Sequence, residues 1–179
     1  MKVNFKNGKC ETVEILDGKG STNPSCTIKT SVQFGDNNNT ATKWSLESVV
    51  DGKDDIKLVE EGTWDGKTMN VKTKSFSRQY PTANPLIHRW ALLPVLASGS
   101  IKKKALVFDM LDDSALRANQ TLRYEGEIEI PVKGGKTKLD SYVQTGYGIV
   151  PTHYLVDSKG QVQLITMSTI NWVLTGREG

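Results

Sequence analysis

Residues that could perform acid–base or nucleophilic chemistry are few in this chain, and they are widely spaced. His88 and His153 are its only histidines, and a histidine base needs a nucleophile and an orienting acid within hydrogen-bond reach. The chain has no nucleophile motif such as GxSxG. In a hydrolase, His153 and Asp157 would be the first candidates, but on a strand they lie about 13 Å apart. We therefore predict no catalytic residues.

Acidic residues gather in two segments, and neither fits a metal-binding loop. One segment is FDMLDD, which contains Asp109, Asp112 and Asp113. It lacks the spacing, the glycine and the terminal glutamate of an EF-hand and is more typical of a strand end followed by a turn. The other segment is an alternating ladder on a predicted strand, typical of a solvated face that Lys136 and Lys138 balance across a hairpin: Glu125, Glu127 and Glu129.

The two cysteines, Cys10 and Cys26, leave two alternatives open. They bracket a turn-rich segment that could be a hairpin-like loop, and a disulfide closing it would stabilise the fold by about 3 kcal/mol. Two unrelated buried thiols explain the same spacing. Without a CxxC motif or enough histidine partners they make a poor zinc site, so we expect no metal and no cofactor.

The elements that must position these residues are mostly strands. From Cys26 onward, period-2 segments recur between turn residues, including GDNNN at 35–39, which is typical of an antiparallel sheet. The predicted strands cover 26–34, 42–50, 55–64, 68–76, 105–111, 122–132, 138–148, 152–157 and 161–174. In KGGK, Gly134 and Gly135 both accept positive φ and predict a tight hairpin. The first half therefore reads as a meander.

The predicted strand 122–132 has two unlike faces. Its charged residues alternate with one apolar set: Leu122, Tyr124, Gly126, Ile128 and Ile130. Such alternation indicates a sheet that is covered on one side only. Some other element must supply the cover.

One dense apolar run, NPLIHRWALLPVLAS, is the candidate for that cover. We predict a helix over Asn84–Ser98, with Asn84 as N-cap, Pro85 at the first position and Gly99 after the end. It is shorter than the roughly twenty residues that span a bilayer, so we exclude a transmembrane helix. Because the run is apolar on nearly every face, the helix should be buried. Pro94 should kink it or end it, so the run forms either one helix or two short turns.

Composition bounds the remaining classes. The chain has 179 residues, a net charge of +3 and 37% hydrophobic residues, which suits a single folded domain over residues 1–179. The only basic cluster, Lys102 to Lys104, is short, so we predict no nucleic-acid partner. No signal peptide is visible. The chain is either cytoplasmic or a processed extracytoplasmic form, and the turn-rich start favours the second alternative.

Four features follow one another over roughly residues 84–166: a short helix containing Leu-Pro, the strand VFDML, a strand ending EIEIPVKGG, and the hairpin HYLVDSKGQVQLI. In this order they resemble bacterial extracytoplasmic proteins of a domain-of-unknown-function group with a lipoprotein-carrier-like half-barrel. The resemblance implies a mainly β fold, with a strongly curved antiparallel sheet wrapped around one short kinked helix. It also implies a periplasmic or secreted location and an apolar ligand such as a lipid.

Two non-enzymatic hypotheses follow. The first is a binding or carrier module for a lipid or other apolar ligand, and its candidate contacts come from the apolar run and from three tyrosines: Leu86, Trp90, Leu93, Leu96, Tyr124, Tyr147 and Tyr154. The second is an interaction or structural protein of the cell envelope that has no small-molecule ligand. In the second hypothesis the apolar helix is simply part of the core.

Overall fold

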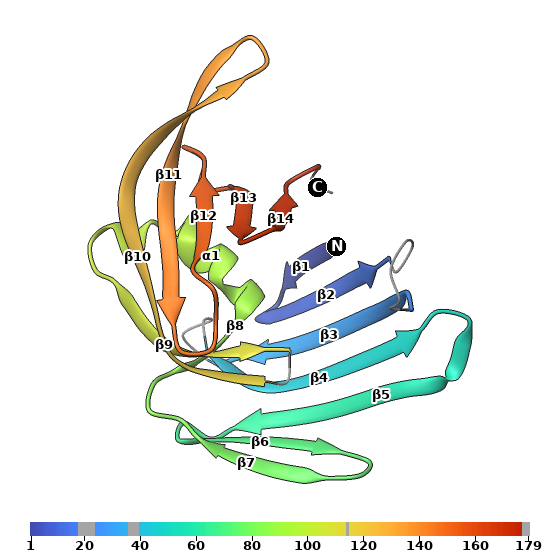
Figure 1. Cartoon of the computed structure of the whole chain (residues 1–179). Coiled ribbons are helices and arrows are strands. Elements are labelled where there is room, and N and C mark those ends of the chain that lie inside the picture. Colours follow the sequence, from blue (N-terminus) through green and yellow to red (C-terminus); the bar gives the residue numbers. More distant parts are fainter. Residues whose placement is uncertain (18–23, 36–39, 114, 177–179) are drawn as a thin grey trace. The chain divides into compact units, whose positions relative to one another are not determined.

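The computed structural model in Figure 1 describes residues 1–17, 24–35, 40–113 and 115–176. The chain is mainly β, as predicted, and it forms two compact units. Unit 1 contains Met1–Ala91 and Asp109–Leu116, and unit 2 contains Leu92–Phe108 and Arg117–Gly179. The prediction of one domain over residues 1–179 stays a prediction, and each unit is described in turn.

Unit 1 is built on a seven-stranded antiparallel meander, sheet A, in which every strand pairs with the next one along the chain. Its strands are β1 (Lys2–Lys6), β2 (Lys9–Leu16), β3 (Cys26–Phe34), β4 (Ala41–Val50), β5 (Lys53–Trp64), β6 (Thr68–Thr73) and β7 (Ser77–Pro81). The predicted meander is confirmed, although β1, β2 and β7 were not predicted. Residues 36–39 of the expected GDNNN turn lie outside the described residues.

The disulfide alternative for the two cysteines is wrong in this structure, because both thiols are free. Cys10 pairs with Val32, whereas Cys26 pairs with Leu16 at the other end of the same two strands. Six residues of extended strand between positions 10 and 16 correspond to roughly 20 Å, far more than a disulfide can bridge. The segment expected to be a loop begins as β2 instead. Burial raises the pKa of the Cys10 thiol to about 12, so that thiol is unreactive.

The predicted helix over Asn84–Ser98 is correct only in its second half. Leu86–His88 forms a short strand, β8, which pairs in parallel with β9 (Leu106–Asp112). Asn84 is not an N-cap, because its side-chain amide donates to the Asp109 carboxylate. The backbone N–H groups of Ala83 and Asn84 donate to the same carboxylate, so Asp109 holds this segment beside β9.

The helical part consists of one 3₁₀ turn, η1 (Arg89–Ala91), followed by α1 (Leu92–Ala97). Pro94 is the third residue of α1, in the first turn, where a backbone N–H has no helical partner in any case. α1 continues through Pro94 to Ala97, so the proline does not end the helix, and at this position it removes no helical hydrogen bond. Gly99 follows the helix at φ 68°, as the predicted stop requires. Within the described residues, no helix is long and apolar enough to cross a membrane.

Sheet B supplies the strands of unit 2. Its order is β14-β13-β12-β11-β10-β9-β8, and it curls around the short helix, as expected. The strands not yet given are β10 (Ala115–Val132), β11 (Gly135–Gly146), β12 (Thr152–Val156), β13 (Val162–Met167) and β14 (Ile170–Val173). β8 and the end of β9 belong to unit 1. The predicted KGGK hairpin is confirmed, since Val132 pairs with Gly135.

A bulge in β10 corrects the predicted faces of strand 122–132. Tyr124 pairs with Tyr142, but Gly126 pairs with Ser141, so Glu125 is an extra residue without a partner. An extra residue reverses the alternation that follows it. Ile128 and Ile130 therefore lie on the face opposite to Tyr124, and the glutamates beyond the bulge lie on the face of Tyr124.

The predicted charge balance across the hairpin is confirmed by two diagonal ion pairs. The Lys138–Glu127 pair has an N–O distance of 2.7 Å, and the Lys136–Glu129 pair has one of 3.3 Å. Both pairs are largely exposed, so each contributes little stability. Beyond the last partner of β12, Asp140, the two long strands continue as a two-stranded ribbon (Figure 1).

The short helices of unit 2 pack against one face of sheet B. Lys102 in η2 (Ser100–Lys102) pairs with Asp140 at 2.5 Å and lies 5.2 Å from the ring centre of Tyr124. At the other end, a Cβ on Gly160 would lie 2.9 Å from the Ala97 carbonyl oxygen. Gly160 therefore allows the β12–β13 turn to approach the end of α1 closely.

Candidate functional site

One face of sheet A carries the buried side chains of that sheet, and we call it the inner face. Its first row crosses the sheet through residues that pair in register: Cys10, Val32, Trp44, Gly62 and Val71. All five are buried. A Cβ on Gly62 would lie 2.0 Å from the Trp44 ring, so the indole lies flat on the glycine. The second row is Thr12, Thr30, Leu46 and Glu60.

The inner face remains apolar where it is no longer covered. Its third row is Glu14, Ile28, Ser48 and Leu58, and its fourth row contains Leu16, Cys26 and Val50. Leu16 and Leu58 are 45% and 46% exposed, and the other apolar members are half-buried. We call Leu16, Cys26, Ile28, Val50 and Leu58 the apolar end. Ser48 lies between Ile28 and Leu58 in the third row. Exposed apolar side chains gathered in one region are typical of a binding surface.

The opposite face of the same strands mixes charged residues with exposed apolar ones, among them Ile15 at 64% and Val59 at 45% exposure. Lys57 pairs there with Glu47 at 2.6 Å and lowers the pKa of that carboxyl group. Two surface hollows in unit 1 have volumes of about 200 and 550 Å³. Most of their lining residues are charged or polar, but the larger hollow also includes Leu58 and Val59. Neither hollow contains a residue that the sequence predicted as a ligand contact.

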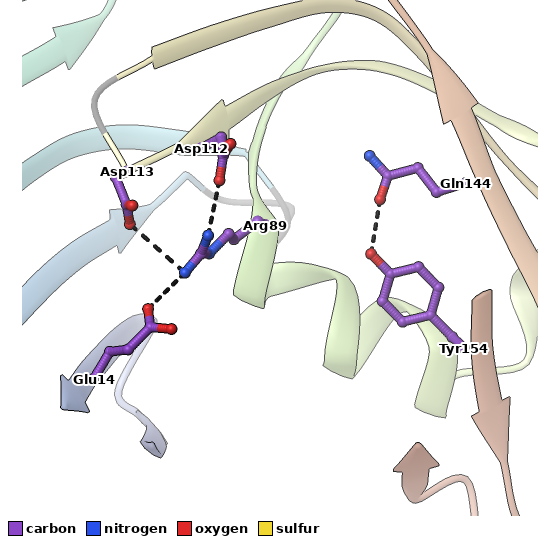
Figure 2. Close-up of polar contacts among 6 residues, drawn as sticks. All are labelled: Glu14, Arg89, Asp112, Asp113, Gln144 and Tyr154. Atoms are coloured by element: carbon purple, nitrogen blue, oxygen red, sulfur yellow. Dashed lines mark hydrogen bonds and ion pairs between the residues drawn. The ribbon is translucent and has the colours of Figure 1, made fainter. Parts of the chain in front are cut away.

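A charged cluster lies beside the apolar end, in unit 1 (Figure 2). The Arg89 guanidinium pairs with Glu14 at 2.7 Å, with Asp112 at 3.0 Å and with Asp113 at 3.9 Å. It also stacks 4.7 Å from the ring centre of Trp90. One cation therefore faces three carboxylates, and the cluster has a net charge of −2 when all four groups are ionised.

The ionisation of this cluster reflects burial and mutual repulsion. Burial raises the pKa of Asp113; Arg89 opposes that shift, and Asp112, Glu14 and Glu60 add to it. Burial lowers the pKa of Arg89, but Asp113, Asp112 and Glu14 outweigh it and raise that pKa above its ordinary value. The guanidinium therefore stays charged, and it does not fully compensate the acids around it.

His88 precedes this arginine and is fully buried. Neither ring nitrogen has a hydrogen-bond partner in the described part of the chain. Burial lowers the pKa of the imidazole to about 3, with a smaller contribution from Arg89. His88 is therefore neutral at physiological pH and carries one unsatisfied N–H, which costs stability.

The predicted ligand contacts from the apolar run are mostly core residues. Leu86 and Trp90 are buried and belong to unit 1, whereas Leu96, also buried, and Leu93, half-buried, belong to unit 2. Three of the four side chains have almost no exposed surface, so their burial stabilises the folded protein without any ligand. Their role as ligand contacts stays a prediction.

The three predicted tyrosines differ in environment. Tyr124 and Tyr154 flank Tyr142 in one row across sheet B, and their hydroxyls donate to Asp140 and Gln144 respectively. Tyr147 lies beyond the end of β11 and is 82% exposed. The structure thus brings Tyr124 and Tyr154 onto one face and leaves Tyr147 apart from them.

A neutral hydrogen-bonded chain lies in the core of unit 2. Tyr154 donates to Gln144 at 2.7 Å (Figure 2), Gln144 donates to Gln120 at 3.2 Å, and Gln120 donates to the carbonyl oxygens of Ala118 and Tyr147. All three side chains are buried. Each polar group satisfies another, as buried polar groups must, so this chain has a structural role.

His153 and Asp157 do not form a catalytic pair. The Asp157 carboxylate accepts from the backbone N–H groups of Lys159 and Gln161 and from the Gln163 amide, so it holds the β12–β13 turn. His153 is half-exposed and lies 3.7 Å from Glu125. Among the described residues there is no group of three or more histidine, cysteine or acidic side chains arranged to hold a metal ion.

The protein is mainly β. Sheet A has exposed apolar side chains at one end of its inner face, and sheet B is a curled half-barrel. Comparison of the sequence with protein-family models and with curated proteins gives no match. Among solved structures, the chain is similar to a β-barrel-like protein of the domain-of-unknown-function group DUF1849 from Brucella abortus. The TM-score is 0.56 at 10% sequence identity, covering 91% of this chain and 77% of the other. At this identity the likeness concerns the fold alone.

The sequence prediction missed the apolar end and the role of Arg89. Ile28, Leu58 and Leu16 lie on three different strands, and their alignment depends on register, which the sequence does not display. Arg89 could have been recognised as an arginine inside an apolar run, a position that requires acidic partners. Asp112 and Asp113 were identified as an acidic group but were assigned to a turn.

Proposed function

We propose that this protein is a non-enzymatic binding or carrier module for a lipid or other apolar ligand. The observation that supports it is the apolar end of sheet A, where the inner face continues outward from the buried Trp44 and Leu46 with apolar side chains that remain accessible. Uncovered apolar surface costs free energy in water, about 25 cal/mol per Å². A ligand that covers this surface recovers that cost.

The proposed location is the periplasm or the medium outside the cell. It rests on the resemblance of roughly residues 84–166 to extracytoplasmic half-barrel proteins. Immunodetection of the chain after cell fractionation tests it. We expect the chain in the periplasmic or secreted fraction, and a cytoplasmic majority would contradict the location while leaving the binding proposal intact.

The binding proposal is tested with a matched pair of substitutions. Leu58 and Val59 are neighbours on β5 with 46% and 45% exposure, but only Leu58 lies on the inner face. We expect Leu58→Gln to weaken uptake of a fluorescent lipid probe about threefold to tenfold, as losing a leucine-sized contact would. Val59→Gln should leave uptake unchanged.

Extraction of the purified protein followed by mass spectrometry gives an independent result. A lipid or other apolar compound that co-purifies with the parent and is depleted in Leu58→Gln supports the proposal. Repeated absence of any bound apolar compound, together with no probe uptake, contradicts it. That result would favour the alternative of an envelope interaction protein without a small-molecule ligand.

A further inference from the structure

The acidic residues around the apolar end lie on the inner face itself. On β2, Glu14 sits between Thr12 and Leu16 and pairs in register with Ile28. On β5, Glu60 sits between Leu58 and Gly62 and pairs with Leu46. Carboxylates therefore border the apolar end on two strands, at the side nearest the buried rows.

Glu14 and Glu60 differ in their ion pairs. Glu14 shares Arg89 with Asp112 and Asp113, whereas Glu60 has no ion pair within the described residues. The inner border of the apolar end therefore holds one carboxylate that shares its cation and one without an ion pair in the described part of the chain. At the far side, Lys53 lies across from Val50, with Asp51 and Asp55 close to it along the chain.

The two glutamates place negative charge at the inner border of the apolar end. A cationic group placed at the inner border would meet Glu14 and Glu60, whereas an anionic group there would be repelled. The complementary occupant is therefore an amphiphile and not a uniformly apolar molecule.

We propose that the ligand is an amphiphile with a cationic amine head, seated with its ammonium group beside Glu14 and Glu60 and its hydrocarbon chain over Ile28, Leu58 and Leu16. The inference rests on the proposed function and specifies the ligand class for the same surface. The apolar chain supplies the area to be covered, and the head group supplies the missing positive charge.

The test compares three probes with the same alkyl chain, each below its micellar concentration: dodecylammonium, dodecyl maltoside and dodecanoate. Isothermal titration calorimetry with the full chain should show the ammonium probe binding tightest and dodecanoate weakest. Because the carboxylates are partly exposed, we expect about fivefold between the ammonium and maltoside probes. Added salt should reduce that difference.

Glu60 and Glu61 provide the matched control, since they are adjacent on β5 and lie on opposite faces. Glu60→Gln should lower dodecylammonium affinity about threefold to fivefold, the size expected for one partly exposed charge, and should leave maltoside binding unchanged. Glu61→Gln should alter neither. Circular dichroism and melting of both variants confirm that the fold is retained.

The outcomes separate the two proposals. Equal binding of all three probes, with no effect of Glu60→Gln, overturns the cationic ligand and leaves an apolar-ligand carrier intact. Tighter binding of dodecanoate overturns it as well. If none of the probes binds, the proposed function fails together with this inference.

Discussion

The polar cluster of unit 1 and the polar chain of unit 2 solve the same physical problem differently (Figure 2). In unit 2, Tyr154, Gln144 and Gln120 are neutral and each donates to an acceptor within 3.2 Å. In unit 1, Arg89 faces three carboxylates, and neither ring nitrogen of the neighbouring His88 has a hydrogen-bond partner among the described residues.

The difference shows that unit 1 contains charged and polar side chains that its fold does not require. A satisfied neutral chain stabilises a core and fixes its geometry. An unbalanced charged cluster and an unsatisfied imidazole reduce stability, and such features persist where something other than folding selects them. The comparison therefore points to unit 1, beside the apolar end, as the place to look for function.

Among substitutions in the charged region, we expect replacement of Trp90 to lower stability most, because Trp90 is buried and stacks with Arg89. Trp90→Ala should lower the free energy of unfolding by about 3–5 kcal/mol, the usual cost of deleting a packed aromatic side chain. Denaturant melts with a lipid-probe titration measure both stability and uptake. A variant as stable as the parent, with unchanged uptake, would show that Trp90 is neither core nor ligand contact.

Removing the arginine itself leaves three carboxylates facing one another. Arg89→Met should cost about 2–4 kcal/mol at neutral pH, somewhat less than for a fully buried ion pair because the groups are partly exposed. The loss should shrink at pH 5, because burial raises the pKa of Asp113, and without Arg89 that carboxyl group takes up a proton more readily. A loss that is the same at both pH values would mean that packing, and not charge, explains it.

The unsatisfied imidazole predicts a pH dependence. Because burial lowers the pKa of His88 to about 3 in the folded chain, only the unfolded chain takes up its proton as the pH falls below about 6.5. Stability should be intact above pH 6.5 and should fall by about 2 kcal/mol between pH 6.5 and 5.

Chemical denaturation across this range measures the effect, with two variants as controls. His88→Leu should remove most of the slope, whereas His153→Gln, at a half-exposed position, should retain it. An unchanged slope in His88→Leu would assign the pH dependence to other groups.

The smallest effect is expected in the satisfied region. Tyr154→Phe removes the buried hydroxyl that donates to Gln144, which should cost about 1–2 kcal/mol. The cost should not change between pH 5 and 8, since none of the groups involved titrates there. A pH-dependent loss would break the contrast between the two regions.

Much of the fold could be predicted from local patterns. The strand 26–34, the tight turn before Gly135 and the pairing of Lys138 with Glu127 follow from alternation, glycine and charge over a few residues. The apolar run also indicated a short helix ending before Gly99, which is correct for its second half only. These features were predictable because neighbours along the chain decide them.

Tertiary structure alone decided the candidate site. Glu14 and Arg89 are 75 positions apart, and Glu14 lies in sheet A whereas Arg89 follows β8 of sheet B. The parallel pairing of β8 with β9, which ends at Asp112, overrode the helix signal at Asn84 and Pro85. The bulge at Glu125 moved Ile128 to the other face, and strand register alone aligned Leu16, Ile28 and Leu58. Local periodicity sets which residues form strands, but the pairing of distant strands sets which side chains share a surface.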